Sequence, residues 1–256
     1  MNGASGDEFA DKVVLITGAA GGFGTLLTQS LIERGAKLVI SDRNDDAIAA
    51  LEQRHSGRRD QVAIRRCDVA REEEVQALVE HATAHFGRLD IAVNNAGLST
   101  PMKAFTEVTE KELDINFAVN AKGVFFGMKH QLRQLMAQGG GGTILNVASK
   151  AGVGGAPKLA AYAAAKHAVV GLTRTAALEY AKHNIRVNAI CPYYSPTPMV
   201  VDGIDVDTQQ MLASLSPMRR LGQPQEMVAV MLMLIAPTTG YLSGQAIVVD
   251  GGMSAG

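Results

Sequence analysis

Tyr162 and Lys166 are the residues of this sequence whose types and spacing most clearly suit chemistry. They stand four positions apart, so on a helix they share one face and lie one turn apart. A tyrosine hydroxyl titrates near ~10 in water, and a neighbouring ammonium stabilises the phenolate and lowers the pKa. Such a pair can move the proton at the oxygen of an alcohol or ketone. Taken alone, the same pair also fits an interface tyrosine beside a solvated lysine.

Ser149 stands 13 residues before Tyr162 and ends a predicted strand. Its hydroxyl can hold a substrate oxygen where negative charge develops, although an ordinary serine at a strand end is the alternative. His167 is adjacent to Lys166 but points about 100° away from it around the helix. We therefore do not expect His167 to act as a base.

The two cysteines, Cys67 and Cys191, are far apart in the sequence, and each ends a strand-like run. Their spacing fits neither a disulfide framework nor a zinc site. We expect both to be buried as small hydrophobic residues, and we expect no bound metal.

A glycine-rich turn, Thr17 to Gly24, follows the first predicted strand. Gly18, Gly22 and Gly24 lack a β-carbon, which allows a tight turn and close approach of the backbone to a pyrophosphate. The N-terminus of the next helix presents free N–H groups and partial positive charge to such an anion. The spacing differs from the usual dinucleotide-binding fingerprint, and a strand-to-helix turn by itself also requires glycine.

Asp42 ends the second predicted strand, 18 residues after Gly24. A carboxylate there can accept hydrogen bonds from both adenosine ribose hydroxyls and repels a 2′-phosphate, which favours NAD over NADP. The neighbouring Arg43 can contact a phosphate, which weakens this preference. Helix capping is the alternative for Asp42. Asp68, after the third strand, can equally bind the adenine amino group or cap a helix.

Strand-like and helix-like segments alternate along nearly the whole chain. We expect strands at residues 13–17, 37–41, 62–67, 89–94, 143–147, 185–190 and 246–249. We expect helices from the glycine turn to residue 34 and at residues 45–55, 72–85, 110–136 and 160–182. Continuous apolar strands are typical of a parallel sheet buried on both faces, and the alternation implies right-handed crossovers. The sequence thus predicts an α/β fold, a doubly wound parallel seven-stranded sheet with helices on both faces, whose ligands bind beyond the carboxyl ends of the strands.

Length and composition narrow the class of protein further. The 256 residues fit one domain, 1–256, in which the irregular segment at about 192–222 is expected to act as a lid. The formal net charge is −1, from 24 basic and 25 acidic residues, which indicates neither a nucleic-acid nor a membrane partner. The N-terminus, Met1 to Lys12, lacks the apolar stretch of a signal peptide, so we expect a cytoplasmic location.

Taken together, these residues make the chain resemble the short-chain dehydrogenase/reductase family over nearly its whole length. The resemblance rests on five motifs in order: Thr17 to Gly24, Asn94-Asn95-Ala96-Gly97, Asn120, Ser149 and Tyr162-x-x-x-Lys166. The sequence departs from the family pattern at Phe23, Ala148, Tyr193 and Ser195. None of these departures removes a catalytic group, but those at 193 and 195 affect the lid and its contacts.

The resemblance implies a catalytic set of Asn120, Ser149, Tyr162 and Lys166. Within that set Lys166 also binds the nicotinamide ribose, and Asn120 positions a water that links Lys166 to solvent. Thr197 matches the family's threonine that binds the carboxamide or a phosphate. We expect the cofactor to be bound by Gly18, Gly22, Phe23, Gly24, Asp42, Arg43, Asp68, Val69, Asn95, Ala96, Gly97, Tyr162, Lys166, Pro192, Ser195 and Thr197.

The predicted reaction transfers a hydride between NAD(H) and a neutral, mainly apolar secondary alcohol or ketone, cyclic or aromatic. The pocket is expected to be lined by Ser99, Val153, Pro157, Tyr193 and Tyr194. By resemblance we also expect a homotetramer, formed through the alanine-rich helix at 160–181 and the long helix before it. Two other functions stay open: an NADPH-dependent ketoacyl reductase, and a non-catalytic dinucleotide-sensing protein on the same fold.

Overall fold

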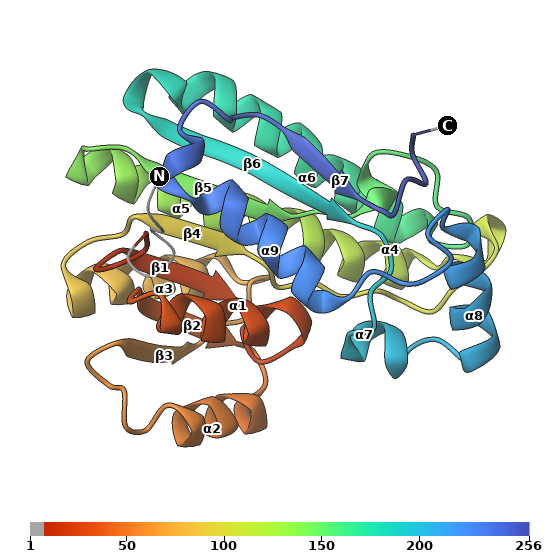
Figure 1. Ribbon diagram of the computed structural model, residues 1–256, viewed down its shortest axis with the longest axis horizontal. Coiled ribbons are helices and arrows are strands. Elements are labelled where there is room, and N and C mark those ends of the chain that lie inside the picture. The colour runs from red at the N-terminus through yellow and green to blue at the C-terminus, as the bar shows by residue number, and fades with distance from the viewer. Residues whose placement is uncertain (1–7, 256) are drawn as a thin grey trace.

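Seven parallel strands form the centre of the structure, a computed structural model that describes residues 8–255. Their order across the sheet is β3-β2-β1-β4-β5-β6-β7 (Figure 1). The strands are β1 (Val13–Thr17), β2 (Lys37–Asp42), β3 (Val62–Arg66), β4 (Ile91–Asn94), β5 (Gly142–Val147), β6 (Ile185–Pro192) and β7 (Ala246–Val249). The predicted sheet is confirmed, and the ends of the strands differ from the predicted ends by at most two residues.

Apolar burial explains why these segments form strands. Every residue of β1 and β6 is buried, and so are the central residues of β2. Strands of this kind are stable only between two layers of helices. The winding reverses between β1 and β4, which are neighbours in the sheet although β2 and β3 separate them in sequence. In such sheets the crevice beyond the carboxyl ends of the strands at the reversal is the usual ligand site.

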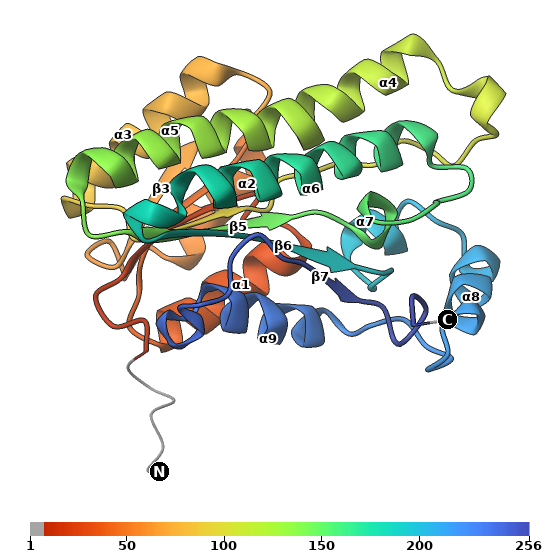
Figure 2. The same cartoon turned by 90° about the horizontal axis from the view of Figure 1, so that it is seen from above.

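Helices cover both faces of the sheet (Figure 2). The helices α3 (Glu72–Phe86), α5 (Gly123–Gln138) and α6 (Ala160–Tyr180) lie on one face, and α1 (Gly22–Glu33) and α9 (Pro224–Ile235) lie on the other. Two separate clusters of buried apolar side chains fill the two spaces between helices and sheet. The doubly wound arrangement expected from the sequence is therefore confirmed.

The remaining helices lie toward the edges and ends of the sheet. Helix α2 (Asp45–Arg54) follows β2, and α4 (Glu110–Asn116) precedes α5. Helices α7 (Pro198–Val201) and α8 (Val206–Leu215) belong to the segment 192–222, which connects β6 to α9 (Figure 1). No helix within residues 8–255 has the length and apolar character needed to cross a membrane.

The helix predicted at 110–136 is present and extends to Gln138, but it contains two kinds of helical turn. Thr109 caps α4, because its hydroxyl accepts from the backbone N–H of Glu112 at 3.3 Å while the Glu112 carboxylate accepts from the N–H of Thr109 at 2.9 Å. A π-helical segment, Phe117–Lys122, then precedes α5. Such segments are rare and often lie at functional sites.

Helix α9 is one that the sequence pattern did not lead us to predict. Its signals are nevertheless present: Pro224 occupies the first position, and the Glu226 carboxylate accepts from the N–H of Gln223 at 2.7 Å. Both features are typical of helix N-termini. Just before this helix, the N–H of Gly222 donates to the carbonyl of Tyr194 at 3.1 Å and thereby closes the base of the segment 192–222.

Candidate active site

The glycine turn brings the backbones of β1, α1 and the loop after β4 into close contact. Gly18 has a φ of +64°, and a β-carbon there would lie 2.8 Å from the Cα of Ala96. A β-carbon on Gly24 would collide with the carbonyl oxygen of Gly18. Glycine is therefore required at both positions.

Helix α1 begins without a capping side chain. Its N-cap is Gly21, and its first turn contains no acidic residue. The first N–H groups and the partial positive charge of the helix are therefore available to an anion. Thr197 lies over the turn, with its methyl carbon 3.2 Å from the position of a β-carbon on Gly22, and the half-buried Phe23 packs against the core. This cradle fits the diphosphate of a dinucleotide.

Asn95 supports the turn from β4. Its side-chain amide donates to the carbonyls of Thr17 and Gly18 at 3.0 and 2.9 Å. In return, the Thr17 hydroxyl accepts from the backbone N–H groups of Asn95 and Ala96, each at 3.1 Å. The amide N–H groups of Asn95 thus hold the glycine turn in shape, and its predicted contact with the cofactor stays a prediction. The part played by Thr17 was not predicted, although its position at a strand end was visible in the sequence.

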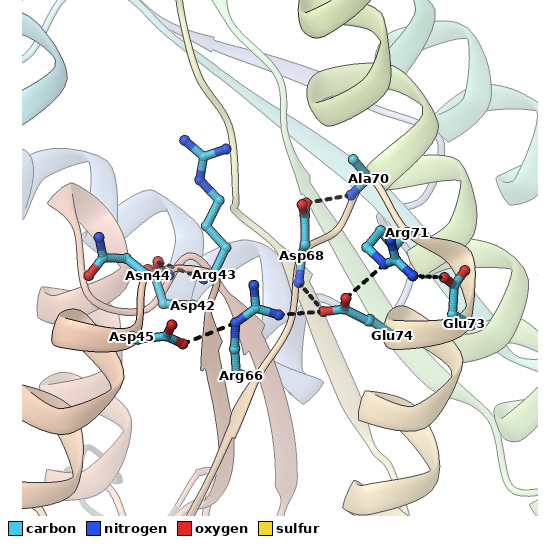
Figure 3. A network of polar contacts seen from close by, with 10 residues as sticks. All are labelled: Asp42, Arg43, Asn44, Asp45, Arg66, Asp68, Ala70, Arg71, Glu73 and Glu74. Atoms are coloured by element: carbon cyan, nitrogen blue, oxygen red, sulfur yellow. Dashed lines mark hydrogen bonds and ion pairs between the residues drawn. The ribbon is translucent and has the colours of Figure 1, made fainter.

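Asp42 lies at the carboxyl end of β2, beside the glycine turn (Figure 3). Its carboxylate accepts from the N–H groups of Ala20 at 3.3 Å and Arg43 at 2.8 Å. Asn44, not Asp42, caps α2 by accepting from the N–H of Ala47 at 2.9 Å. The capping alternative for Asp42 is therefore wrong. Arg43 makes no ion pair within residues 8–255, and its guanidinium extends away from the Asp42 carboxylate (Figure 3).

Asp68 lies in the loop between β3 and α3. Its carboxylate accepts from the N–H of Ala70 at 3.0 Å, so it stabilises a turn rather than the N-terminus of α3, whose N-cap is Arg71. Its own N–H donates to the Glu74 carboxylate at 2.9 Å, which also pairs with Arg66 and Arg71 (Figure 3).

Val69 follows Asp68 and packs against α5. A β-carbon on Gly123 of that helix would lie 2.8 Å from a methyl group of Val69. The loop that carries Asp68 and Val69 is thus held by both α3 and α5. The contact of Asp68 and Val69 with the cofactor stays a prediction.

Lys166 and Tyr162 meet on one face of α6, as their spacing predicts. The Lys166 Nζ lies 5.6 Å from the centre of the Tyr162 ring and donates to the Val147 carbonyl at 2.8 Å. Only 3% of Lys166 is exposed. Burial lowers the pKa of Lys166 to about 8, because desolvation disfavours the ammonium.

Burial shifts the pKa of Tyr162 in the opposite direction. It raises the pKa of Tyr162 to about 12, while hydrogen bonding with Ser149 lowers that pKa in part, and Tyr194 raises it further. The lowered tyrosine pKa expected from the neighbouring lysine is not found in the protein alone, because desolvation of the phenolate has the largest effect on this pKa. The side chains of the protein thus keep Tyr162 protonated at neutral pH.

Ser149 lies two residues after β5 and caps a short 3-10 turn, Lys150–Gly152. Its Oγ accepts from the N–H of Ala151 at 3.1 Å. A hydroxyl that accepts one hydrogen bond keeps its own proton for another partner. Ser149 can therefore donate toward an oxygen placed next to Tyr162.

Asn120 lies in the π-helical segment and is completely buried. Its side-chain amide donates to the Leu98 carbonyl at 2.9 Å and to Asn116 at 3.1 Å, and it accepts from the N–H of Leu98 at 3.0 Å. A β-carbon on Gly97 would lie 3.0 Å from its Oδ1 and 3.5 Å from the Lys166 Nζ. Both N–H groups of the amide are thereby engaged, and the water link between Asn120 and Lys166 stays a prediction.

Both cysteines are buried, as predicted. Cys191 lies near the end of β6, close enough to Lys166 and Tyr162 to influence the pKa of each. Burial raises the pKa of the Cys191 thiol to about 11, so the thiol is neutral. Its place beside the pair was not predicted. In the described part of the chain, no group of three or more His, Cys, Asp or Glu side chains could hold a metal ion.

Beyond Pro192, the last residue of β6, the chain passes Ser195 and reaches Thr197. Ser195 is 2% exposed, and its hydroxyl has no hydrogen-bond partner within residues 8–255. Its carbonyl accepts from the N–H of Thr197 at 2.7 Å. An unsatisfied buried hydroxyl is unfavourable, so a ligand that pairs with Ser195 would stabilise this segment.

Tyr193 and Tyr194 point in different directions. Tyr194 is the one that acts on the pKa of Tyr162. The Tyr193 hydroxyl donates to the carbonyl of Leu212 at 3.3 Å, and its ring lines a separate cavity of about 160 Å³ beside Met227. Tyr193 thus lines the cavity beside Met227, whereas Tyr194 is close enough to Tyr162 to act on its pKa.

The other predicted pocket residues lie in loops. Ser99 makes a hydrogen bond with the carbonyl of Thr100 at 3.2 Å. Val153 is 36% exposed, and Pro157 lies in the loop before α6. Their contact with a substrate stays a prediction.

Known proteins resemble the chain in sequence and in structure. A family model described as enoyl-(acyl carrier protein) reductase matches residues 18–254. A 2,5-dichloro-2,5-cyclohexadiene-1,4-diol dehydrogenase of Sphingobium indicum is 37% identical over 97% of this chain and 99% of its own. A cyclohexanol dehydrogenase of an Acinetobacter species is 35% identical over 96% of each chain. The crystal structure of a levodione reductase superposes with a TM-score of 0.91 at 35% identity, over 96% of this chain and 99% of that one.

Two further solved structures carry a cofactor. A 3-ketoacyl-(acyl-carrier-protein) reductase of Brucella melitensis, complexed with NADH, has a TM-score of 0.88 and 33% identity over 96% of this chain and 99% of that one. A structure of ElxO with NADP bound has a TM-score of 0.90 and 29% identity over 96% and 100%. Sequence and fold agree, and the chain belongs to the short-chain dehydrogenase/reductase family of nicotinamide-dependent oxidoreductases.

Proposed function

We propose that this protein oxidises a neutral, mainly apolar cyclic secondary alcohol, or reduces the corresponding ketone, with NAD(H). The observation that carries the proposal is the Tyr162–Lys166 pair, with its 5.6 Å contact, on the helix beside the strand end that holds Ser149. The printed activities of several relatives concern cyclic diols, cyclohexanol and levodione, which supports this substrate class.

Tyr162 is assigned the role of general acid and base. In the cofactor-free protein its hydroxyl is protonated, since burial raises its pKa to about 12. It is therefore ready to donate a proton to a ketone oxygen, and it needs added positive charge nearby to act as a base toward an alcohol. The bound nicotinamide supplies the hydride acceptor or donor.

Ser149 and Lys166 position the reacting groups. The Ser149 hydroxyl, beside Tyr162, can donate to the same substrate oxygen and so holds it in place. Lys166 is fixed by its bond to Val147 at 2.8 Å, and its remaining N–H donors can bind the nicotinamide ribose. We assign Asn120 a supporting part, through its hold on Leu98.

Asp42 supports NAD as the preferred cofactor. Its carboxylate stands at the end of β2, near the N–H of Ala20 in the glycine turn, where it can accept from ribose hydroxyls and would repel a 2′-phosphate. Arg43 is the residue that could favour NADP instead, because its guanidinium extends away without an ion pair among the described residues. The unpaired hydroxyl of Ser195 is suited to a carboxamide.

Turnover with a panel of alcohols tests the substrate class. Cyclohexanol and other cyclic secondary alcohols with NAD⁺ are expected to produce reduced cofactor, followed by its absorbance. A linear ketoacyl thioester with NADPH is the comparison. Preference for the thioester and NADPH would contradict the proposal and favour a ketoacyl reductase.

A further inference from the structure

Tyr193 stands where the family pattern has glycine, at the first position after β6. Its backbone N–H donates to the carbonyl of Val249 in β7 at 2.9 Å. Its hydroxyl donates to the carbonyl of Leu212 at 3.3 Å. Leu212 lies in the last turn of α8, where carbonyls lack partners along the helix. A side chain that the family pattern lacks thus ties α8 to the edge of the sheet.

The ring of Tyr193 borders two features at once. It lines the cavity of about 160 Å³, whose apolar lining includes Met218, Met227 and Val249. It also packs edge to face against the ring of Tyr194, with the ring centres 4.9 Å apart and the planes at 86°. Tyr194 does not line this cavity. Tyr193 therefore fills space that the Tyr194 ring would otherwise reach.

Tyr194 is held at both its backbone and its ring. Its carbonyl accepts from the N–H of Gly222 at 3.1 Å, and its half-buried ring is held by the contact with Tyr193. Edge-to-face pairs of this kind prefer one geometry. Tyr194 is also close enough to Tyr162 to act on its pKa. The position of the Tyr194 ring thus depends on Tyr193, and it affects the space beside Tyr162.

From these contacts we propose that Tyr193 is a positioning residue that limits the size of the substrate, by holding Tyr194 as a wall beside Tyr162. The inference rests on the proposed function, because it places the reacting alcohol next to Tyr162. Without the ring of Tyr193, its volume would join the neighbouring cavity and Tyr194 would turn toward the enlarged space. The wild-type pocket accordingly favours alcohols of a single ring over those of two fused rings.

The kinetics of Tyr193→Ala with two alcohols and NAD⁺ test this assignment. The ratio of kcat/KM for decahydro-2-naphthol over cyclohexanol is expected to rise at least about tenfold above that of the wild type, the scale on which pocket shape discriminates substrates. For cyclohexanol, KM should rise while kcat changes less than about threefold, because Tyr193 does not touch the reacting atoms. Tyr193→Phe keeps the ring contact, so its ratio should stay within about twofold of the wild type.

Two further variants separate the wall from the cavity. Met218→Ala enlarges the same cavity without removing the contact between Tyr193 and Tyr194, and it should leave the ratio unchanged. Tyr194→Ala removes the wall itself and should raise the ratio as Tyr193→Ala does, which keeps the test decisive if Tyr193→Ala fails to fold. Circular dichroism and NADH binding verify the folding of each variant.

The outcomes distinguish this inference from the function on which it rests. Wild-type turnover of cyclohexanol with an unchanged ratio in Tyr194→Ala or in folded Tyr193→Ala would overturn the part assigned to Tyr193. An equal rise in Met218→Ala would overturn it too, since the cavity alone would then set the size limit. A wild type that turns over neither alcohol would overturn the proposed function and this inference with it.

Discussion

At the residue scale, burial moves the pKa values of the two central side chains in opposite directions. The pKa of Lys166 falls to about 8 and that of Tyr162 rises to about 12. Near neutral pH the site therefore contains an ammonium, held at some expense of stability, and a protonated phenol. Such destabilised groups are common where a protein is built for chemistry rather than for maximal stability.

The lowered pKa of Lys166 should be visible in the pH dependence of the stability of the cofactor-free protein. Its pKa is lowered on folding from 10.5 to about 8, so between these values the unfolded chain binds the extra proton and stability rises with pH. Relative to Lys166→Met, the free energy of unfolding of the wild type should rise by about 1.4 kcal/mol per pH unit between pH 8 and about 10, and stay level below pH 8. Urea unfolding across this range measures it. Parallel curves for both proteins would contradict the assignment.

Cofactor choice is expected to depend on one carboxylate. Asp42→Ala removes the group that repels a 2′-phosphate, while Arg43 remains to attract it. The ratio of kcat/KM for NAD⁺ over NADP⁺ should fall at least about tenfold, equivalent to about 1.4 kcal/mol. Asp45→Ala is the control, since Asp45 is a nearby exposed carboxylate paired with Arg66. An unchanged ratio in Asp42→Ala would remove Asp42 from the account of cofactor preference.

The residue types and spacings predicted the meeting of Tyr162 with Lys166, but not what surrounds them. Helical geometry alone places those two side chains on one face. The alternatives for Asp42 needed the structure, because only the hydrogen bond from the N–H of Ala47 to Asn44 shows that Asn44 is the cap of α2. The burial that raises the tyrosine pKa depends on packing from other elements, Tyr194 among them, which local spacing cannot reveal.

At the scale of elements, the segment between β6 and α9 contributes a buried hydroxyl, that of Ser195, to the site. Ser195 stands where the family pattern has an apolar residue, and its buried hydroxyl lacks a partner within the described chain. Thr197, two residues on, touches the glycine turn at Gly22. The segment therefore lies over the cofactor cradle in a form that a bound carboxamide could complete.

Ser195→Ala should separate the stability of this segment from cofactor binding. Loss of an unsatisfied hydroxyl is expected to stabilise the cofactor-free protein, by up to about 1–3 kcal/mol. The same change should reduce the rise in melting temperature caused by NADH, because one hydrogen bond to the cofactor is lost. Differential scanning calorimetry with and without NADH measures both. Ser214 is an exposed serine of α8, and Ser214→Ala should change neither the stability nor the rise in melting temperature with NADH. If NADH raises the melting temperature of Ser195→Ala as much as that of the wild type, the contact between Ser195 and the cofactor is contradicted.

Strands were more predictable than helices, for a physical reason. A strand buried on both faces is a continuous apolar run, as in β1 and β6. Asn120, in the π-helical segment, is hydrogen-bonded to Leu98, 22 residues earlier, and such contacts leave no mark on apolar periodicity. The start of α9 did carry capping signals, but they lay beside an irregular, proline-containing segment.

At the scale of the whole molecule, exposed apolar side chains support the proposed tetramer. Leu178 of α6 is 84% exposed, and Phe125 of α5 is 46% exposed. Both helices lie on the same face of the sheet (Figure 2). Apolar surface of this kind is typical of contacts between subunits. The cytoplasmic location, like the tetramer, stays a prediction.

Light scattering coupled to size-exclusion chromatography tests the assembly. The wild type is expected to elute as a tetramer at micromolar concentration. Leu178→Asp, which would bury a charge in the contact, should shift it to smaller species. The exposed residue Leu215 of α8 lies outside those helices, so Leu215→Asp should leave the tetramer intact. A monomeric wild type would refute the proposed assembly.

The most direct measurement of the central claim compares Tyr162→Phe with the wild type in two assays. The variant keeps the ring against Lys166 but lacks the hydroxyl whose proton is transferred. Turnover of a cyclic secondary alcohol should fall by roughly 10²–10⁴-fold, while the dissociation constant for NADH, measured by fluorescence, stays within about twofold. Substantial turnover in Tyr162→Phe would contradict the assignment of Tyr162 as the acid and base of this site.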